Sequence, residues 1–127
     1  MKKQTIFFGI IVILILGAII SFVVANSSKP KVSKYDTFAT CLKDQGAVFY
    51  GAFWCPHCKA QKAEFGPAVK LLNYIECSNP DAKSQKQICI DKKIESYPTW
   101  EFKDGTRLTG EVPMKTLAEK TSCVLPE

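Results

Sequence analysis

The stretch Trp54-Cys55-Pro56-His57-Cys58 decides the interpretation of this chain. The apolar run before it, residues 47–53, is typical of a buried strand, and residues 59–65 after it favour a helix. Pro56 suits the first helical turn, where its missing N–H would have no partner in any case. The two cysteines are therefore predicted to lie where a strand passes into a helix.

A cysteine at a helix start has distinctive chemistry. Backbone N–H groups without intrahelical partners surround it, and the positive end of the helix dipole lies there. Both stabilise the thiolate of Cys55, which is the nucleophilic form, and His57 adds a donor and, when protonated, a positive charge. A stabilised thiolate favours the reduced state, so the Cys55–Cys58 disulfide is predicted to be a good oxidant. We predict a dithiol/disulfide exchange site in which Cys55 is the nucleophile and Cys58 the resolving thiol.

Two other interpretations of a C-x-x-C pair are an inert disulfide and half of a zinc site. Zinc requires two further ligands at suitable spacing. Cys77 and Cys89 are separated by eleven residues, and His57 lies inside the first pair rather than in a second one. No metal or organic cofactor is therefore expected, and a copper- or zinc-binding module is the alternative from a different functional class.

The N-terminal part of the chain is strongly apolar. Residues 6–24 contain no charged side chain, and about 1.5 Å of helix rise per residue makes them about long enough for a bilayer core of about 30 Å. We expect residues 1–25 to form a single transmembrane anchor, residues 26–35 a linker and residues 36–127 the folded domain. A cleaved signal peptide is the alternative, because residues 23–25 include small side chains suited to a peptidase.

The net charge of +5 does not indicate a nucleic-acid-binding domain. It comes from the lysines that flank the apolar segment, and acidic and basic residues balance from residue 36 onward. No basic stripe with interleaved aromatic residues is found, so nucleic acid is not an expected partner. Six cysteines in a short chain suggest an oxidising compartment. The domain is therefore expected in the periplasm or extracellular space, tethered to the membrane.

The predicted order of elements resembles the thioredoxin fold, an α/β fold with a central mixed sheet flanked by helices. The expected helices and strands are a helix over 37–43, a strand over 47–53, a helix over 59–72 broken at Gly66-Pro67, a strand over 74–77, a helix over 82–91, a hairpin over 99–109 and a helix over 113–120.

A second mark of this resemblance is Ser96-Tyr97-Pro98-Thr99. In thioredoxin-like proteins a proline here is cis, packs against the C-x-x-C and leaves the preceding residue free to pair with an incoming peptide. The resemblance implies that Tyr97 and Pro98 bind substrate. Trp54 could complete an apolar rim, although core packing is the commoner fate of such aromatic residues, as expected for Trp100.

A narrower resemblance is carried by several short motifs. They are Phe38-Ala39, Cys41-Leu42, Gly46-Ala47, the run from Tyr50 to Cys58, Gln61-Lys62, Phe65-Gly66, the run Tyr74-Ile75-Glu76-Cys77 and the run from Tyr97 to Trp100. Together they resemble the thioredoxin-like domain attached to bacterial and plant vitamin K epoxide reductase homologues. In those proteins the domain exchanges disulfides with a four-helix membrane enzyme that passes electrons to a quinone. The resemblance therefore implies a quinone-linked membrane oxidoreductase as partner.

The direction of electron flow is predicted from two features. The Cys-Pro-His-Cys tetrapeptide is similar to that of periplasmic disulfide oxidases, and Phe49 stands where typical cytoplasmic thioredoxins carry a buried Asp. Both favour a thiol–disulfide oxidoreductase of the disulfide oxidase or isomerase type, which would oxidise thiol-containing secreted proteins. A reductase of the same fold, fed by a membrane electron donor, is the alternative.

The remaining four cysteines allow three pairings. Cys77 and Cys89 enclose a short loop, and the resembling family has a cysteine pair in the corresponding places, which implies a structural disulfide. Cys41 and Cys123 could pair with each other. Cys123 could instead be a shuttle thiol, and Cys41 a small buried hydrophobic residue. The sequence does not choose among these alternatives.

Overall fold

The computed structural model of this chain describes residues 1–25 and 32–127. It divides into two compact units, Met1–Lys31 and Val32–Glu127, which are described separately. Most of the predicted linker, residues 26–31, lies outside the described residues.

The N-terminal unit contains one helix, α1, over Lys2–Ala25. Within the described residues, no helix combines the length and the apolar character needed to cross a membrane. The transmembrane anchor predicted for residues 1–25 stays a prediction.

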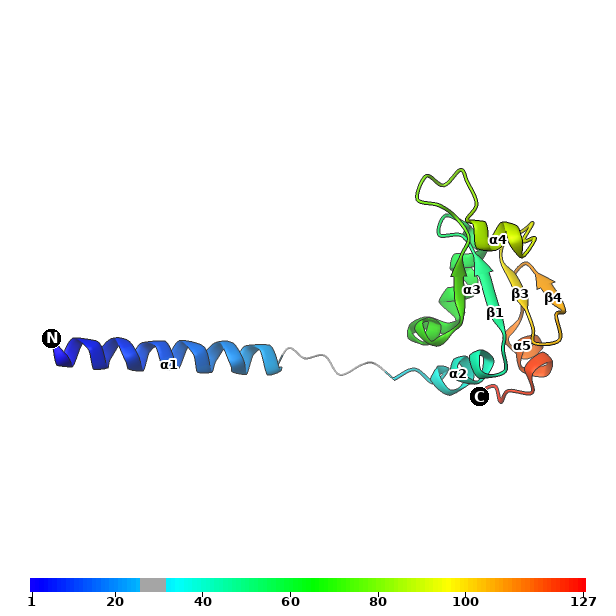
Figure 1. The fold of residues 1–127 in the computed structure, drawn as a ribbon. Coiled ribbons are helices and arrows are strands. Elements are labelled where there is room, and N and C mark those ends of the chain that lie inside the picture. Colours follow the sequence, from blue (N-terminus) through cyan, green and yellow to red (C-terminus); the bar gives the residue numbers. More distant parts are fainter. Residues whose placement is uncertain (26–31) are drawn as a thin grey trace. The chain divides into compact units, whose positions relative to one another are not determined.

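The second unit is built on a mixed sheet of four strands in the order β2-β1-β3-β4 (Figure 1). The strands are β1 (Val48–Gly51), β2 (Tyr74–Glu76), β3 (Thr99–Glu101) and β4 (Arg107–Thr109). Strand β1 pairs in parallel with β2 and antiparallel with β3, which forms an antiparallel hairpin with β4. This agrees with the predicted thioredoxin-like α/β fold.

Five helical segments accompany the sheet. They are α2 (Asp36–Asp44), α3 (Pro56–Phe65), the 3-10 helix η1 (Gly66–Leu71), α4 (Gln87–Asp91) and α5 (Met114–Thr121). Helix α3 ends at Phe65. Its C-cap is Gly66, whose φ of 54° is positive, and Pro67 follows, so the predicted break after α3 is confirmed.

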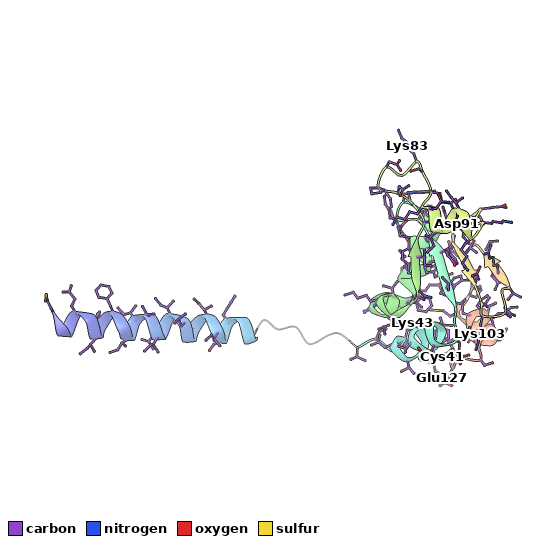
Figure 2. All side chains as sticks on the ribbon, in the orientation of Figure 1. Cys41, Lys43, Lys83, Asp91, Lys103 and Glu127 are labelled. Carbon is purple, nitrogen blue, oxygen red and sulfur yellow. A yellow bond between two sulfur atoms is a disulfide. The ribbon has the colours of Figure 1, made fainter. Side chains whose placement is uncertain are left out.

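The helix predicted over 82–91 is wrong in its first half, because α4 begins at Gln87. The Asp81 carboxylate accepts hydrogen bonds from the backbone N–H groups of Lys83 and Ser84, and Ala82 has a positive φ of 56°. Asp side chains commonly compete with helix formation in this way. Residues 77–86 therefore form a loop that carries Lys83 at its tip, while Cys41 and Glu127 lie at the opposite end of this unit (Figure 2).

Strand β1 is buried on both faces. Phe49 stacks on Trp100 with 4.7 Å between ring centroids and belongs to the larger core cluster. The next residue, Tyr50, packs on the other face with Cys77, Cys89 and Ile94. Successive side chains of a strand point to opposite faces, so β1 joins both cores and holds the segment that follows it in place.

Candidate functional site

The two C-x-x-C thiols occupy different environments at the start of α3. Cys55 is the N-cap residue, and its Sγ accepts a hydrogen bond from the Cys58 backbone N–H at 3.3 Å. Its exposed fraction is 4%, whereas Cys58 is fully buried. Both are free cysteines. Burial, with the hydrogen bond to Cys55, raises the pKa of Cys58 to about 12. Cys58 is thus held as a neutral thiol, and of the two buried cysteines Cys55 is the one that keeps a small exposed fraction.

The Tyr97–Pro98 peptide bond is cis. The carbonyl oxygen of Tyr97 lies 3.8 Å from the Cys55 Sγ, which is positioned to donate a hydrogen bond to it. The backbone just before Pro98 therefore faces the Cys55 thiol.

Trp54 and Tyr97 form an aromatic edge beside this backbone. Trp54 is 46% exposed, and its ring meets the half-buried Tyr97 edge-on with 6.0 Å between centroids. The indole N–H of Trp54 donates to Ser78 Oγ at 2.9 Å, and Gln85 donates to the Tyr97 hydroxyl at 2.7 Å. Trp100 is buried, as expected. A groove that begins at Trp54, the residue before Cys55, is lined by Trp54, Ile94, Glu95, Tyr97 and residues of the 78–85 loop.

His57 has a partner that the sequence did not suggest. Its Nδ1 lies 2.6 Å from Glu111 Oε1, and both side chains are exposed. A single sequence contains no signal that connects positions 54 residues apart. Glu111 therefore joins the candidate site from the segment after β4.

Buried Gln61 holds that segment against α3. Its Oε1 accepts from the Val112 backbone N–H at 2.7 Å, and its Nε2 donates to the Val112 carbonyl at 3.1 Å. A fully buried amide is costly unless both of its ends are hydrogen-bonded, and here both are. Gln61 thereby places Glu111 near the start of α3.

A polar cluster lies on the β2 side of the dithiol. One Glu76 oxygen accepts from the backbone N–H groups of Phe53 and Ser78, and the other accepts from the Tyr74 hydroxyl at 2.6 Å. The Lys62 ammonium lies over the Tyr74 ring, 3.3 Å from its centroid. Sequence reasoning assigned no role to this cluster. Two signals were present, because Lys62 is one helical turn after Cys58 and Tyr74 and Glu76 share one face of a strand.

The other four cysteines form two disulfides. Cys77 is bonded to Cys89, and Cys41 in α2 to Cys123 beyond α5. The second bond settles the pairing that the sequence left open. Residues 1–25 and 32–127 contain no group of three or more side chains suited to hold a metal ion.

The fold and the dithiol define a class of protein: a thioredoxin-like domain with a C-x-x-C beside a cis-proline. Comparison with known proteins agrees. Residues 29–122 match the family Thioredoxin, and the chain belongs to that family.

The chain is similar to several curated proteins. It is 41% identical over 108 residues to Thiol-disulfide oxidoreductase LTO1 of Arabidopsis thaliana, covering 82% of this chain and 28% of that protein. It is 32% identical over 88 residues to Protein disulfide-isomerase of Humicola insolens, covering 66% of this chain and 17% of that protein. It is 34% identical over 79 residues to Protein disulfide-isomerase of Arthroderma benhamiae, covering 58% of this chain and 15% of that protein. The chain thus spans less than a third of the length of each of these relatives.

Proposed function

We propose that this protein is a thiol–disulfide oxidoreductase that uses Cys55 and Cys58 to oxidise dithiols in secreted proteins. The observation that carries the proposal is the asymmetry of the pair. Cys55 caps a helix, keeps an exposed fraction of 4% and faces the backbone before cis-Pro98, whereas Cys58 is fully buried. The names of the matched relatives support this class of activity.

The chemistry needs nothing beyond the two sulfurs and the incoming thiols. A substrate thiolate attacks Cys55 Sγ of the oxidised pair, the Cys55–Cys58 bond breaks, and Cys58 leaves with the electron pair. A second substrate thiolate then attacks the substrate sulfur of the mixed disulfide and releases Cys55 as a thiolate. The substrate leaves with a new disulfide, and the protein is left reduced.

The groove beside Cys55 supports an extended peptide as substrate. Trp54 and Tyr97 offer an apolar edge, and the 78–85 loop supplies polar groups. The backbone of Tyr97 and Pro98 borders the attacked sulfur, so a peptide paired there would bring its own cysteine to Cys55. An apolar edge with backbone pairing suits unfolded chains of varied sequence.

Oxidation rather than reduction is favoured by the core beneath the thiols. Phe49 stacks on Trp100 in the core cluster that also contains Cys55 and Cys58, and Phe49 stands at the position where cytoplasmic thioredoxins carry a carboxylate. The two structural disulfides suit an oxidising compartment, which supports a location outside the cytoplasm. We infer that reoxidation comes from a quinone-linked membrane oxidoreductase. The relation of residues 1–25 to a membrane stays a prediction.

The experiment is the oxidation of a reduced peptide that contains two cysteines by stoichiometric oxidised protein. We expect one peptide disulfide to form per protein, with loss of the Cys55–Cys58 bond by mass spectrometry. The matched control is the Cys55→Ala/Cys58→Ala protein, which keeps both structural disulfides and should oxidise nothing. Equal oxidation by this control would refute the proposal.

A further inference from the structure

Cys58 is a poor leaving group. In the first step of substrate oxidation the Cys55–Cys58 bond breaks and Cys58 departs as a thiolate. A leaving thiol of high pKa departs slowly, and the burial that raises the pKa of Cys58 would oppose its departure as an anion. Phe49 offers no proton from the core side, so this step needs a donor elsewhere.

One cation, the Lys62 ammonium, shares a neighbour with the buried sulfur, and that neighbour is the Tyr74 ring. Lys62 is four residues after Cys58 on α3, so both side chains lie on the same helical face. Cys58 Sγ and the Tyr74 Cε2 each lie 3.0 Å from the position that a Cβ on Gly51 would take. Glycine at this position thus lets the sulfur and the Tyr74 ring share one small space. The Lys62 ammonium sits on that same ring, 3.3 Å from its centroid.

We propose that the Lys62 ammonium donates the proton that Cys58 takes up as it leaves Cys55. This rests on the proposed function. A substrate thiolate bonds to Cys55 Sγ, the Cys55–Cys58 bond breaks, and its electron pair stays on Cys58. The proton passes from Lys62 Nζ to Cys58 Sγ, which becomes a thiol, and Lys62 becomes a neutral amine that is reprotonated from solvent. In the reverse reaction the neutral amine removes the Cys58 proton.

The groups around Lys62 fit this task. Burial lowers the pKa of Lys62 and makes it a stronger acid, while the charge of Glu76 acts in the opposite direction. Burial and the hydrogen bond to Glu76 raise the pKa of Tyr74, so the ring stays neutral. Cys55 and Cys58 are the other titratable groups that act on the ammonium. Glu76 is anchored by two backbone N–H groups and positions Tyr74 beneath Lys62.

The test is the rate at which glutathione reduces the oxidised full-length protein, expressed per glutathione thiolate, across pH. A general acid contributes typically 10²- to 10⁴-fold, so Lys62→Gln should slow this rate about a hundredfold. Lys62→Arg should slow it similarly, because arginine keeps the charge but does not release its proton. The matched control is Lys59→Gln, an exposed lysine on the same helix, which should react like the unaltered protein. Methylammonium should partly restore the rate of Lys62→Ala.

An unaltered rate in Lys62→Gln would overturn the proton transfer. An unaltered rate in Lys62→Arg would also overturn it, because the positive charge of the side chain would then be sufficient for the reaction. The unaltered protein gives an independent readout that needs no variant. Its rate per glutathione thiolate should fall as pH rises through the pKa of Lys62, and a flat profile would overturn the proposal. A protein that does not exchange with glutathione at any pH would instead refute the proposed function itself.

Discussion

Removal of the Cys41–Cys123 bridge is expected to destabilise the domain more than removal of the Cys77–Cys89 bridge. The first joins residues 82 apart and the second residues 12 apart. A cross-link lowers the entropy of the unfolded chain by an amount that grows with the logarithm of the loop it closes. This relation gives about 4.5 kcal/mol for the long loop and about 3 kcal/mol for the short one.

The measurement is urea unfolding of two double variants, Cys41→Ala/Cys123→Ala and Cys77→Ala/Cys89→Ala, followed by the fluorescence of buried Trp100. The difference of about 1.5 kcal/mol should also appear as roughly 6–12 °C between the melting temperatures, since about 1 kcal/mol shifts a domain of this size by about 4–8 °C.

Equal losses, or a larger loss for the short loop, would refute the loop-entropy reasoning. A second outcome bears on function. If the Cys77→Ala/Cys89→Ala protein folds well but no longer exchanges disulfides, the pair carries electrons, and its assignment as a structural bridge is wrong.

Three further perturbations test the site and the fold. His57→Ser should lower the reduction potential of the Cys55–Cys58 pair by about 20 mV, because a surface charge interaction is worth about 1 kcal/mol. An unchanged potential in a glutathione redox titration would show that His57 does not tune the dithiol. Cys58→Ala should accumulate mixed disulfides in cells and Cys55→Ala far fewer, by mass spectrometry; equal trapping would reverse the two roles. Burial opposes ionisation of Glu101, but Arg107 outweighs it and lowers the pKa of that carboxyl. The ionised Glu101 stabilises the fold at pH values above its unfolded pKa of about 4.3, and this contribution is lost as pH falls through the folded pKa. Glu101→Gln should therefore lower the free energy of unfolding by about 1 kcal/mol at pH 7 and by less at pH 3. The same difference in urea midpoints at both pH values would contradict this.

The fold could be predicted from the sequence because its signals are local. Each signal depends only on the residues of its own segment, as in the apolar run before Cys55, the Gly66-Pro67 break and the hairpin over 99–109. The order of elements followed from these segments. The start of α4 was missed, because the competing hydrogen bonds from the Asp81 carboxylate are as local as a helix signal but are not apparent in a hydropathy pattern.

The residues of the candidate site likewise divide into those that the sequence could predict and those that it could not. Cys55 and Cys58 were predicted from a motif that is contiguous along the chain, and Pro98 from the resemblance to thioredoxin-like proteins. Glu111 was not, because Gln61 brings it to α3 through hydrogen bonds across 51 residues. Lys62 was passed over because its neighbour on β2, Tyr74, becomes adjacent only when the parallel β1–β2 pair forms.

The central claim is that the dithiol at Cys55 and Cys58 is an oxidant. The most direct test is its reduction potential, measured by equilibrating the full chain with glutathione buffers and quantifying the Cys55–Cys58 bond by mass spectrometry. We expect a value near about −120 mV, the range of strong protein oxidants. A value near about −270 mV, the range of reductants, would contradict it.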